Sequence, residues 1–522
     1  MRACFALACA LTVPAWPGLA RTASAAELNV AAAAAAANSI TRNELKRHVE
    51  VLADDSFEGR EAGSRGGHAA GIYLRKEMVQ HRLEPLGTDG DYFQYFQGRY
   101  RNVLGMIRGS DQQLMREVIL VGAHYDHVGY GRATNSFGPL GYIHNGADDN
   151  ASGTAGLLEL MEAFDRLAEP PRRSVVFAFW DGEEKGLLGS WHYVSNPSIP
   201  LKRTRLFVNL DMIGRLRGED LTVHGARTGF GLRQLVARAN RAGRLSLDFN
   251  WEIKDNSDHF PFYQRQVPFV MLHTGLHDDY HSPRDDVEKV NVDGMQQVTR
   301  LLFNVVYEAA NRDDTTQFRS AVRYESESTR QRLERPRALP PARFGVSWDR
   351  QADAQDGVRV TRVRAGSAAA AAGIRPGDRI VRVAEHEIAS GQQLRAAIVR
   401  ATTPTLVIVR RDGKQSPLFL NVHLRGRAYR IGLSWRVDDA EPNSVFVTRV
   451  IPGSAADHAG LKYGDRVYEI NGRPLAGSNE FYEAITSQRG SFDLLVERAG
   501  RLLNRRIELT TLLVADADLA GE

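Results

Sequence analysis

Five short polar clusters follow apolar stretches in the first three hundred residues, and each contains a His, Asp or Glu that can bind a metal ion. In chain order they are His124-Tyr125-Asp126-His127, Asp148-Asp149, Asp181-Gly182-Glu183-Glu184, Asp211 and Tyr280-His281. Imidazole and carboxylate groups without thiolates are typical of hydrolytic zinc sites, whereas structural sites usually contain Cys. Even two of these histidines together with the several carboxylates exceed what one ion uses. We therefore expect two metal ions that share one bridging carboxylate.

Each cluster also has a simpler explanation when it is taken alone. A His at a strand end usually makes a structural hydrogen bond, and Glu183-Glu184 could be a solvated acidic pair. Asp148-Asp149 could cap the helix that follows, because Asp favours helix starts. Five such clusters at successive strand ends are much harder to assign to chance, so we interpret them as one site.

Apolar runs of strand length alternate with stretches of helical periodicity around these clusters. The predicted strands are residues 117–123, 174–180, 205–210 and 267–272, and the predicted helices are 154–168, 186–193 and 295–310. This alternation predicts an α/β domain with a mainly parallel mixed sheet and flanking helices. Ligands bind beyond the carboxyl ends of the strands in such sheets, where the polar clusters lie.

The ordered motifs of this region resemble those of the co-catalytic dizinc exopeptidases, which include bacterial leucyl aminopeptidases. The motifs are GAHYDHVG, GADDNASG, WDGEEKGLLGS, NLDMIG and DYHSPRDD. The resemblance covers about residues 40–310 and implies the zinc exopeptidase fold with two Zn²⁺ ions per chain. It implies that His124 and Asp211 bind one ion, that Glu184 and His281 bind the other, and that Asp149 bridges them.

The same resemblance implies roles for three further residues. Glu183 would be the general base that accepts a proton from the attacking water and passes it to the leaving amine. Asp126 is expected to point the same way as His124 on an extended strand and to orient its imidazole. Asp258 matches a recurrent family segment near the substrate, although a turn or helix cap would use the same residue. His127 is an extra histidine, which we expect to support a ligand or to face solvent rather than to bind metal.

A repeat fills the C-terminal third of the chain. Gly366-Ser367-Ala368-Ala369 recurs as Gly453-Ser454-Ala455-Ala456, and Gly377-Asp378-Arg379 recurs as Gly464-Asp465-Arg466, both at an offset of 87 residues (453 − 366 and 464 − 377). Each copy predicts a strand, a short helix capped by Ser367 or Ser454 and closed by Gly373 or Gly460, and then another strand.

These copies resemble PDZ domains of the bacterial periplasmic protease type, which are small and β-rich. The resemblance implies that two loops bind the C-terminal carboxylate of a peptide, which adds as a strand. The loops are Phe344-Gly345-Val346 and Ile431-Gly432-Leu433. The alternative is that one or both copies only pack against the first domain.

The N-terminus has the features of a secretory signal peptide. Arg2 precedes an apolar run that is too short to span a bilayer, and small residues near Ala26 offer cleavage sites. Cleavage would remove Cys4 and Cys9, the only cysteines, and leave a mature chain suited to an oxidising compartment. We expect export to the periplasm or the medium, with no membrane-spanning segment in the mature chain.

The composition fits a folded multidomain protein. The 522 residues are 43% hydrophobic and 25% charged, and a net charge of +4 gives no reason to expect nucleic acid as a partner. The predicted segments are a signal peptide (1–26), a flexible Ala-rich lead-in (27–39), the zinc peptidase domain (40–312), a solvated linker (313–341), PDZ-like domains at 342–425 and 428–512, and a tail (513–522).

The leading hypothesis from the sequence is an exported zinc aminopeptidase acting on peptides or proteins, with peptide C-termini as possible PDZ ligands. A carboxypeptidase or amidohydrolase could use the same centre. Glutaminyl cyclase activity is disfavoured, because its relatives use a single zinc. A peptide-binding scaffold with a vestigial peptidase domain is a third reading, and the complete ligand set argues against it.

Overall fold

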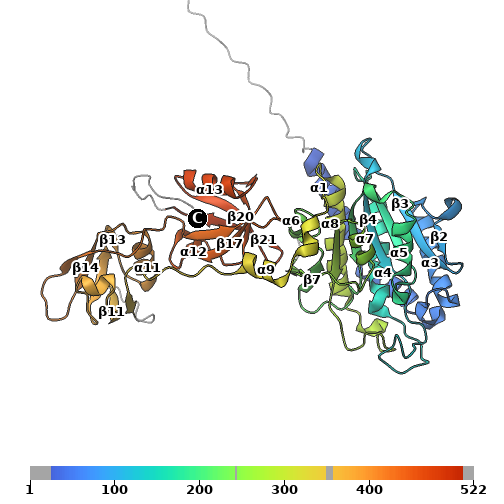
Figure 1. The fold of residues 1–522 in the computed structure, drawn as a ribbon, viewed down its shortest axis with the longest axis horizontal. Coiled ribbons are helices and arrows are strands. Elements are labelled where there is room, and N and C mark those ends of the chain that lie inside the picture. Colours follow the sequence, from blue (N-terminus) through green and yellow to red (C-terminus); the bar gives the residue numbers. More distant parts are fainter. Residues whose placement is uncertain (1–24, 241–243, 349–356, 510–522) are drawn as a thin grey trace, which may run out of the picture.

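The computed structural model describes residues 25–240, 244–348 and 357–509, and it places a sheet in each of three consecutive parts of the chain (Figure 1). The predicted signal peptide up to residue 24 and the predicted tail lie outside the described residues. The first sheet has nine strands in the order β1-β3-β5-β4-β6-β9-β7-β8, with β2 paired to β3. Its strands are β1 (Glu84–Pro85), β2 (Phe93–Phe96), β3 (Tyr100–Ile107), β4 (Val118–His124), β5 (Ser174–Trp180), β6 (Thr204–Leu210), β7 (Asp220–His224), β8 (Ser246–Phe249) and β9 (Phe269–His273).

The central strands of this sheet are parallel, and the strands that flank them on both sides are antiparallel to them. Strands β5, β4, β6 and β9 run parallel, whereas β3 is antiparallel to β5 and β7 is antiparallel to β9. The mainly parallel mixed sheet predicted from the sequence is therefore confirmed. The central strands were predictable because they are long and apolar, whereas short edge strands such as β7 and β8 carry little periodicity.

Two helical layers enclose the sheet. One layer contains α2 (Arg42–Leu52), α3 (Arg65–Gln80), α4 (Gly153–Asp165), α6 (Leu232–Ala239) and α8 (Val292–Asn311), and the other contains α5 (Leu188–Ser195) and α7 (His259–Gln264). Ile119 and Val121 of β4 pack in the first layer, while Val118 and Leu120 pack in the second. The alternation of side chains along a strand explains why β4 is apolar throughout.

The Ala-rich lead-in is a helix, which corrects the flexible segment expected from the sequence. Helix α1 spans Ala25–Ser39, and Ala33, Ala36 and Ala37 are buried in the first core layer. Alanine has the highest intrinsic helix propensity, and its small side chain lets α1 approach α8 and α4 closely. Low sequence complexity was therefore misleading here.

The two repeats fold as separate antiparallel sheets with similar topology. The first comprises β10 (Val346–Trp348), β11 (Val358–Val363), α10 (Ala368–Ala371), β12 (Arg379–Val383), β13 (His386–Glu387), α11 (Gly391–Arg400), β14 (Thr405–Arg410) and β15 (Leu418–Val422). The second comprises β16 (Leu433–Arg436), β17 (Val445–Val450), α12 (Ala455–His458), β18 (Arg466–Ile470), β19 (Arg473–Pro474), α13 (Ser478–Ser487), β20 (Phe492–Arg498) and β21 (Arg501–Ile507).

The predicted caps of the short helices are confirmed. The Ser367 hydroxyl accepts a hydrogen bond from the backbone N–H of Ala370, and Ser454 accepts one from Asp457. Gly373 and Gly460 follow the two helices at φ values of +80° and +75°, a backbone conformation that favours glycine.

The second repeat lies between the α/β domain and the first repeat (Figure 1). Ion pairs join it to the α/β domain, with Arg227 2.9 Å from Asp438 and Arg233 2.8 Å from Glu497. A backbone hydrogen bond from Leu247 to Ala499 also crosses this contact. The second repeat is therefore packed against the α/β domain, as one alternative from the sequence allowed.

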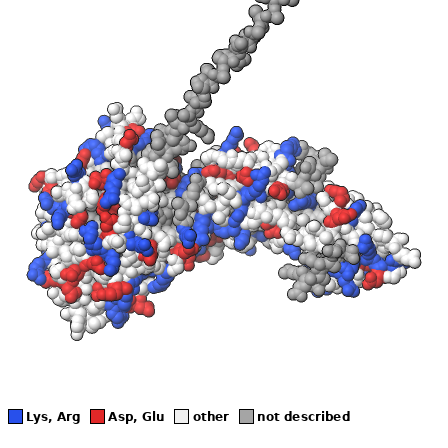
Figure 2. All heavy atoms as spheres, turned by 180° about the vertical axis from the view of Figure 1, so that it is seen from behind, with Lys and Arg blue, Asp and Glu red and all other residues white. Residues whose placement is uncertain are grey.

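The segment between the domains is more ordered than a solvated linker. It contains α9 (Glu327–Glu334), and Val322 is buried. Arg319 is also buried and pairs with Glu325, which pairs in turn with Arg227. The mixed Arg and Glu composition suggested solvent exposure, but these charges neutralise one another against the α/β domain. On the face shown in Figure 2, basic and acidic side chains are interspersed over the molecule.

Candidate metal centre

The predicted ligands lie at the carboxyl ends of the parallel strands. His124 is the last residue of β4, and Asp211 directly follows β6. Glu183 and Glu184 lie in the turn after β5, and His281 lies in the loop after β9. Asp149 lies in the irregular turn Ala147–Ser152 that precedes α4. The structure therefore brings together residues that are up to 157 positions apart (281 − 124).

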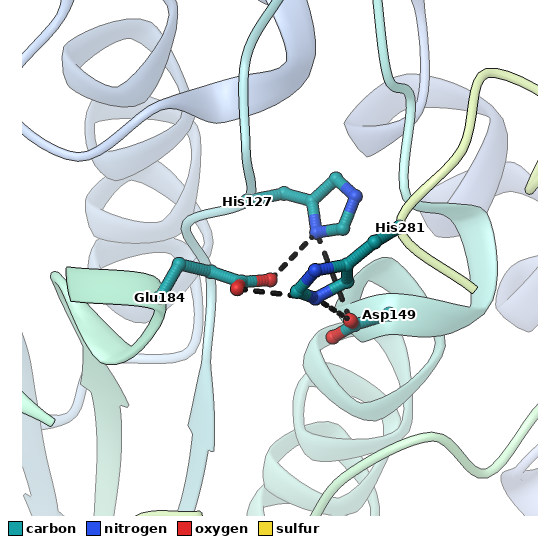
Figure 3. Close-up of side chains that lie close together, drawn as sticks. All are labelled: His127, Asp149, Glu184 and His281. Atoms are coloured by element: carbon teal, nitrogen blue, oxygen red, sulfur yellow. Dashed lines mark hydrogen bonds and ion pairs between the residues drawn. The ribbon is translucent and has the colours of Figure 1, made fainter. Parts of the chain in front are cut away.

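Asp149 joins two groups of potential ligands. Its Oδ1 lies 3.4 Å from His124 Nε2, which in turn lies 3.6 Å from Asp211 Oδ1. Its Oδ2 lies 3.1 Å from His281 Nε2, which lies 3.2 Å from Glu184 Oε2 (Figure 3). One carboxylate thus presents an oxygen to each group, which is the arrangement of a residue that bridges two metal ions.

The chemistry of the two groups fits zinc. They contain imidazole nitrogen and carboxylate oxygen and no sulfur, as in hydrolytic zinc sites. His281 Nε2 is buried and makes no hydrogen bond within the described part of the chain. Burial lowers the pKa of His281, but Asp149 and Glu184 outweigh this effect and raise it to about 10. The two carboxylates therefore favour a positive charge next to them. Without metal the protonated His281 carries this charge, and a bound metal ion would carry it instead.

The turn before α4 depends on a glycine. Gly146 has a φ of +54°, and a Cβ at this position would lie 2.2 Å from the carbonyl oxygen of Asp149 and 2.5 Å from the His127 ring. A side chain at residue 146 would therefore displace Asp149, the predicted bridging residue.

Asp126 makes a different contact from the one expected. The Nδ1–H of His124 donates to the backbone carbonyl of Asp126 at 3.2 Å, whereas the Asp126 carboxylate lies 3.9 Å from that nitrogen. The carboxylate accepts the backbone N–H of Glu183 at 3.0 Å and that of Glu184 at 3.3 Å. Strand β4 ends at His124, so Asp126 is outside the extended segment and points toward the turn after β5. Its side chain positions the two glutamates rather than the imidazole.

Glu183 and Glu184 have different electrostatic surroundings. Burial raises the pKa of Glu183 well above its usual range, although His124 opposes this shift. Burial also raises the pKa of Glu184, but the neighbouring imidazoles of His127 and His281 outweigh this effect and hold the pKa well below its usual range. A carboxyl group with a raised pKa suits proton transfer, whereas one that stays ionised suits a ligand.

Asp258 is buried next to the site and does not cap a helix. Its Oδ1 accepts a hydrogen bond from Ser190, and its Oδ2 has no partner among the described residues. It precedes α7 without making a side-chain cap hydrogen bond. Burial raises its pKa to about 7. Its role toward a substrate remains a prediction.

The structure gives the positions of two further residues near the centre, His127 and Asp285, that the sequence alone did not settle or did not identify. His127 is buried, which excludes the solvent-facing alternative, and its Nδ1 lies 2.9 Å from Glu184 Oε1 (Figure 3). Asp285 Oδ2 accepts the backbone N–H groups of Asp148 and Asp149, both at 3.0 Å. Asp285 lies inside the DYHSPRDD motif, so that motif is the sequence feature from which its place near the centre could have been predicted.

A buried cation lies beside the acidic groups. The guanidinium of Arg60 donates to the backbone carbonyls of Tyr125, Asn145 and Gly146, among others. Burial lowers its pKa to about 10, while Asp149 and Asp126 act in the opposite direction. Arg60 thus fixes two segments of the site and offsets part of its negative charge.

The loops predicted to bind peptides line grooves in both repeats. Ile431, Gly432 and Leu433 line a cavity of about 990 Å³ in the second repeat. Phe344, Gly345 and Val346 line a smaller one of about 260 Å³ in the first, which Leu339, Pro340 and Pro341 also border. The second groove therefore offers more space for a ligand.

The fold and the centre define a metallopeptidase-like domain followed by two small β-rich modules. Residues 102–306 match Peptidase family M28, and residues 332–409 and 421–494 match the PDZ domain. The chain therefore contains an M28 peptidase domain and two PDZ domains, as the resemblances implied. Within the described residues, no helix has the length and apolar content needed to cross a membrane.

Several known proteins are similar to the peptidase domain. Aminopeptidase YwaD of Bacillus subtilis (strain 168) is 30% identical over 209 residues, which cover 38% of this chain and 42% of YwaD. Leupeptin-inactivating enzyme 1 of Streptomyces exfoliatus is 26% identical over 312 residues, which cover 59% of this chain and 66% of that enzyme. The chain thus spans between 42% and 66% of the length of these two relatives.

Solved structures include aminopeptidases as well. The LapA aminopeptidase of Legionella pneumophila is 20% identical with a TM-score of 0.46, covering 54% of this chain and 75% of LapA. BSAP, a zinc aminopeptidase from Bacillus subtilis, is 17% identical with a TM-score of 0.43, and the match covers 53% of this chain and 96% of BSAP.

Proposed function

We propose that this protein is an exported aminopeptidase that uses two zinc ions to remove N-terminal residues from peptides. The observation that carries the proposal is the position of Asp149, whose two oxygens face two separate groups of ligands. The proposed ligands are His124 and Asp211 for one ion, Glu184 and His281 for the other, and Asp149 for both. Similarity to proteins named as aminopeptidases supports the choice of substrate end.

The mechanism follows from the residues around the two ions. Zinc ions held by His124, Asp211, Glu184, His281 and Asp149 would lower the pKa of a water molecule and polarise the carbonyl of the scissile bond. Glu183 accepts the proton from that water and delivers it to the leaving amine. Asp126 holds the backbone of Glu183 and Glu184 in place, so that the base and the ligand stay adjacent.

A substrate panel with metal analysis tests this proposal. Purified protein should contain close to two zinc ions per chain and should hydrolyse aminoacyl reporters, but not N-blocked ones. Preference for C-terminal reporters would instead establish a carboxypeptidase, the alternative that shares this centre. Two bound ions without hydrolysis of any reporter would favour a peptide-binding scaffold.

The N-terminal sequence supports export with cleavage near residue 26, and we propose a mature chain that begins close to α1. The proposed domain boundaries are 40–312, 342–425 and 428–512, with α1 packed on the first domain. N-terminal sequencing of protein from the periplasm or the medium checks this. An intact residue 1 on active protein in the cytoplasm would contradict it.

The groove of the second PDZ domain is proposed to bind peptide C-termini. Arg436 and Arg449 line it. Arg436 donates to the backbone carbonyl of Leu333 and Arg449 to that of Ala338, and these carbonyls carry no charge. Their charges favour an acidic peptide. A fluorescent peptide with a free carboxylate should bind at least about 10-fold more tightly than its C-terminal amide. Equal binding of the two peptides would show that the carboxylate is not recognised.

A further inference from the structure

His127 lies against the group formed by Asp149, Glu184 and His281, called the second group below, whereas His124, Asp149 and Asp211 form the first group. The backbone N–H of His127 donates to the backbone carbonyl of Arg60 at 3.2 Å. The backbones of His127 and Glu61 also form an isolated β-bridge. His127 is 1% exposed. Its ring meets the ring of His281 edge-on, with centroids 5.4 Å apart and planes at 81°. The imidazole is therefore fixed in direction by the fold.

The Nδ1 atom of His127 faces the same two carboxylates as His281. It lies 2.9 Å from Glu184 Oε1 and 3.8 Å from Asp149 Oδ2 (Figure 3). His281 Nε2 lies 3.2 Å from the other oxygen of Glu184, Oε2, and 3.1 Å from Asp149 Oδ2. No described residue hydrogen-bonds to Nε2 of His127, so Nδ1 is the nitrogen that the fold directs toward the acids.

These separations match those expected around a single tetrahedral ion. Ligand atoms about 2.0–2.1 Å from a tetrahedral zinc lie about 3.3 Å from one another. Donor atoms of His127, Asp149, Glu184 and His281 all lie within 4.8 Å of one another, and the first group contains only His124, Asp149 and Asp211 within the described residues. The second group thus has one more imidazole than the first.

We propose that His127 is a third imidazole ligand, so that one zinc ion has four protein ligands and the other has three. This inference rests on the proposed dizinc function. Four protein ligands form a closed site, whereas three leave a position open for water or substrate. The ion near His281 therefore binds more tightly and fills first, and the open position lies on the side of His124 and Asp211.

The variant His127→Asn separates a ligand from a hydrogen-bond donor. The Asn amide can still donate to Glu184, but it is a poor substitute for imidazole at zinc. Zinc affinity is measured by competition with a chromophoric chelator. The expected result is a loss of more than about 100-fold at one site, because residues that only orient a ligand cost about 10–100-fold. The other site should keep its affinity.

His144→Asn is the matched control. His144 is equally buried, but its ring contacts Ser136 and the carbonyl of Tyr142 and belongs to neither ligand group. It should leave both zinc affinities unchanged, which separates the loss of a ligand from the loss of a buried imidazole.

X-ray absorption of the wild-type protein with two zinc ions tests the inference without a variant. Three imidazoles on two ions average 1.5 per ion, whereas His124 and His281 alone average one. An average near one, or a His127→Asn affinity loss of less than about 100-fold, would overturn the role of His127. Failure of the wild-type protein to bind two ions would instead overturn the proposed dizinc centre.

Discussion

The carboxylate of Asp285 accepts the backbone N–H of Asp149 at 3.0 Å, and thereby positions the residue that faces both ligand groups. Arg215 donates to the other oxygen of Asp285 at 2.8 Å. The proposed bridging residue is thus supported from a loop more than a hundred residues away along the chain.

Replacing Asp285 should weaken metal binding without removing a ligand. Asp285→Ala should lower zinc affinity by about 10–100-fold, because Asp149 loses the group that holds its backbone. Chelator competition measures the affinity. Asp293→Ala, which removes an exposed ion pair with Arg42, is the control and should have no effect. Equal affinities of the two variants would show that Asp149 is positioned by other contacts.

Glu183→Gln should separate catalysis from metal binding. We expect two bound zinc ions and a loss of about 10²–10⁴-fold in kcat, because Gln cannot accept the proton. His281→Ala and Asp149→Ala should lose metal as well as activity. Near wild-type turnover by Glu183→Gln would refute its role as the general base.

The buried carboxyl of Glu159 should make stability depend on pH. Burial raises its pKa from 4.5 to about 8, and the nearby His48 stays neutral because burial lowers its pKa to about 3. The folded state therefore favours protonated Glu159. Its contribution to stability is full below about pH 4.5 and is lost as the pH rises toward 8.

Glu159→Gln should remove this dependence. At about pH 8.5 we expect the variant to be more stable than the wild type by about 1–3 kcal/mol, and the difference should disappear toward about pH 5. Chemical denaturation at both pH values measures it. The control Glu50→Gln, on the exposed side of α2, should change stability by less than about 0.5 kcal/mol. A pH-independent difference would rule out titration of Glu159.

The contact between the second PDZ domain and the peptidase domain should contribute strongly to stability. Arg233→Ala would leave Glu497, which is 0% exposed, without its guanidinium partner. Breaking a buried ion pair in this way typically costs about 3–5 kcal/mol. Arg506→Ala removes an exposed pair with Asp493 from the same β20–β21 hairpin and should cost less than about 1 kcal/mol. Similar denaturation midpoints for the two variants would show that the domains contact each other only weakly.

A chain ending at residue 314 should retain the metal centre, because all proposed ligands precede it. We expect it to bind two zinc ions and to cleave small aminoacyl reporters. It should unfold at a lower temperature than the full chain, because Arg227 and Arg233 lose their partners in the second PDZ domain. Soluble, folded protein that binds no zinc would mean that the PDZ domains complete the centre.

The sequence by itself determined the class of fold and most of the centre. Long apolar strands such as β4 and β5 are visible as runs because both faces of a parallel strand are buried. The polar residues that follow these runs had to meet at one edge of the sheet. The repeat was equally accessible, because two similar sequences at a constant offset fold in the same way.

Only the tertiary structure decided how individual side chains are directed. Strand β4 ends at His124, so the Asp126 carboxylate contacts two backbone N–H groups of the turn after β5 instead of the imidazole. The direction of His127 depends on the segment at Arg60 and Glu61, which no local pattern links to it. Whether α1 packs, and which PDZ domain contacts the peptidase domain, depends on complementary surfaces far apart in the chain. Local patterns determine elements, whereas contacts between distant segments determine the orientation of their side chains.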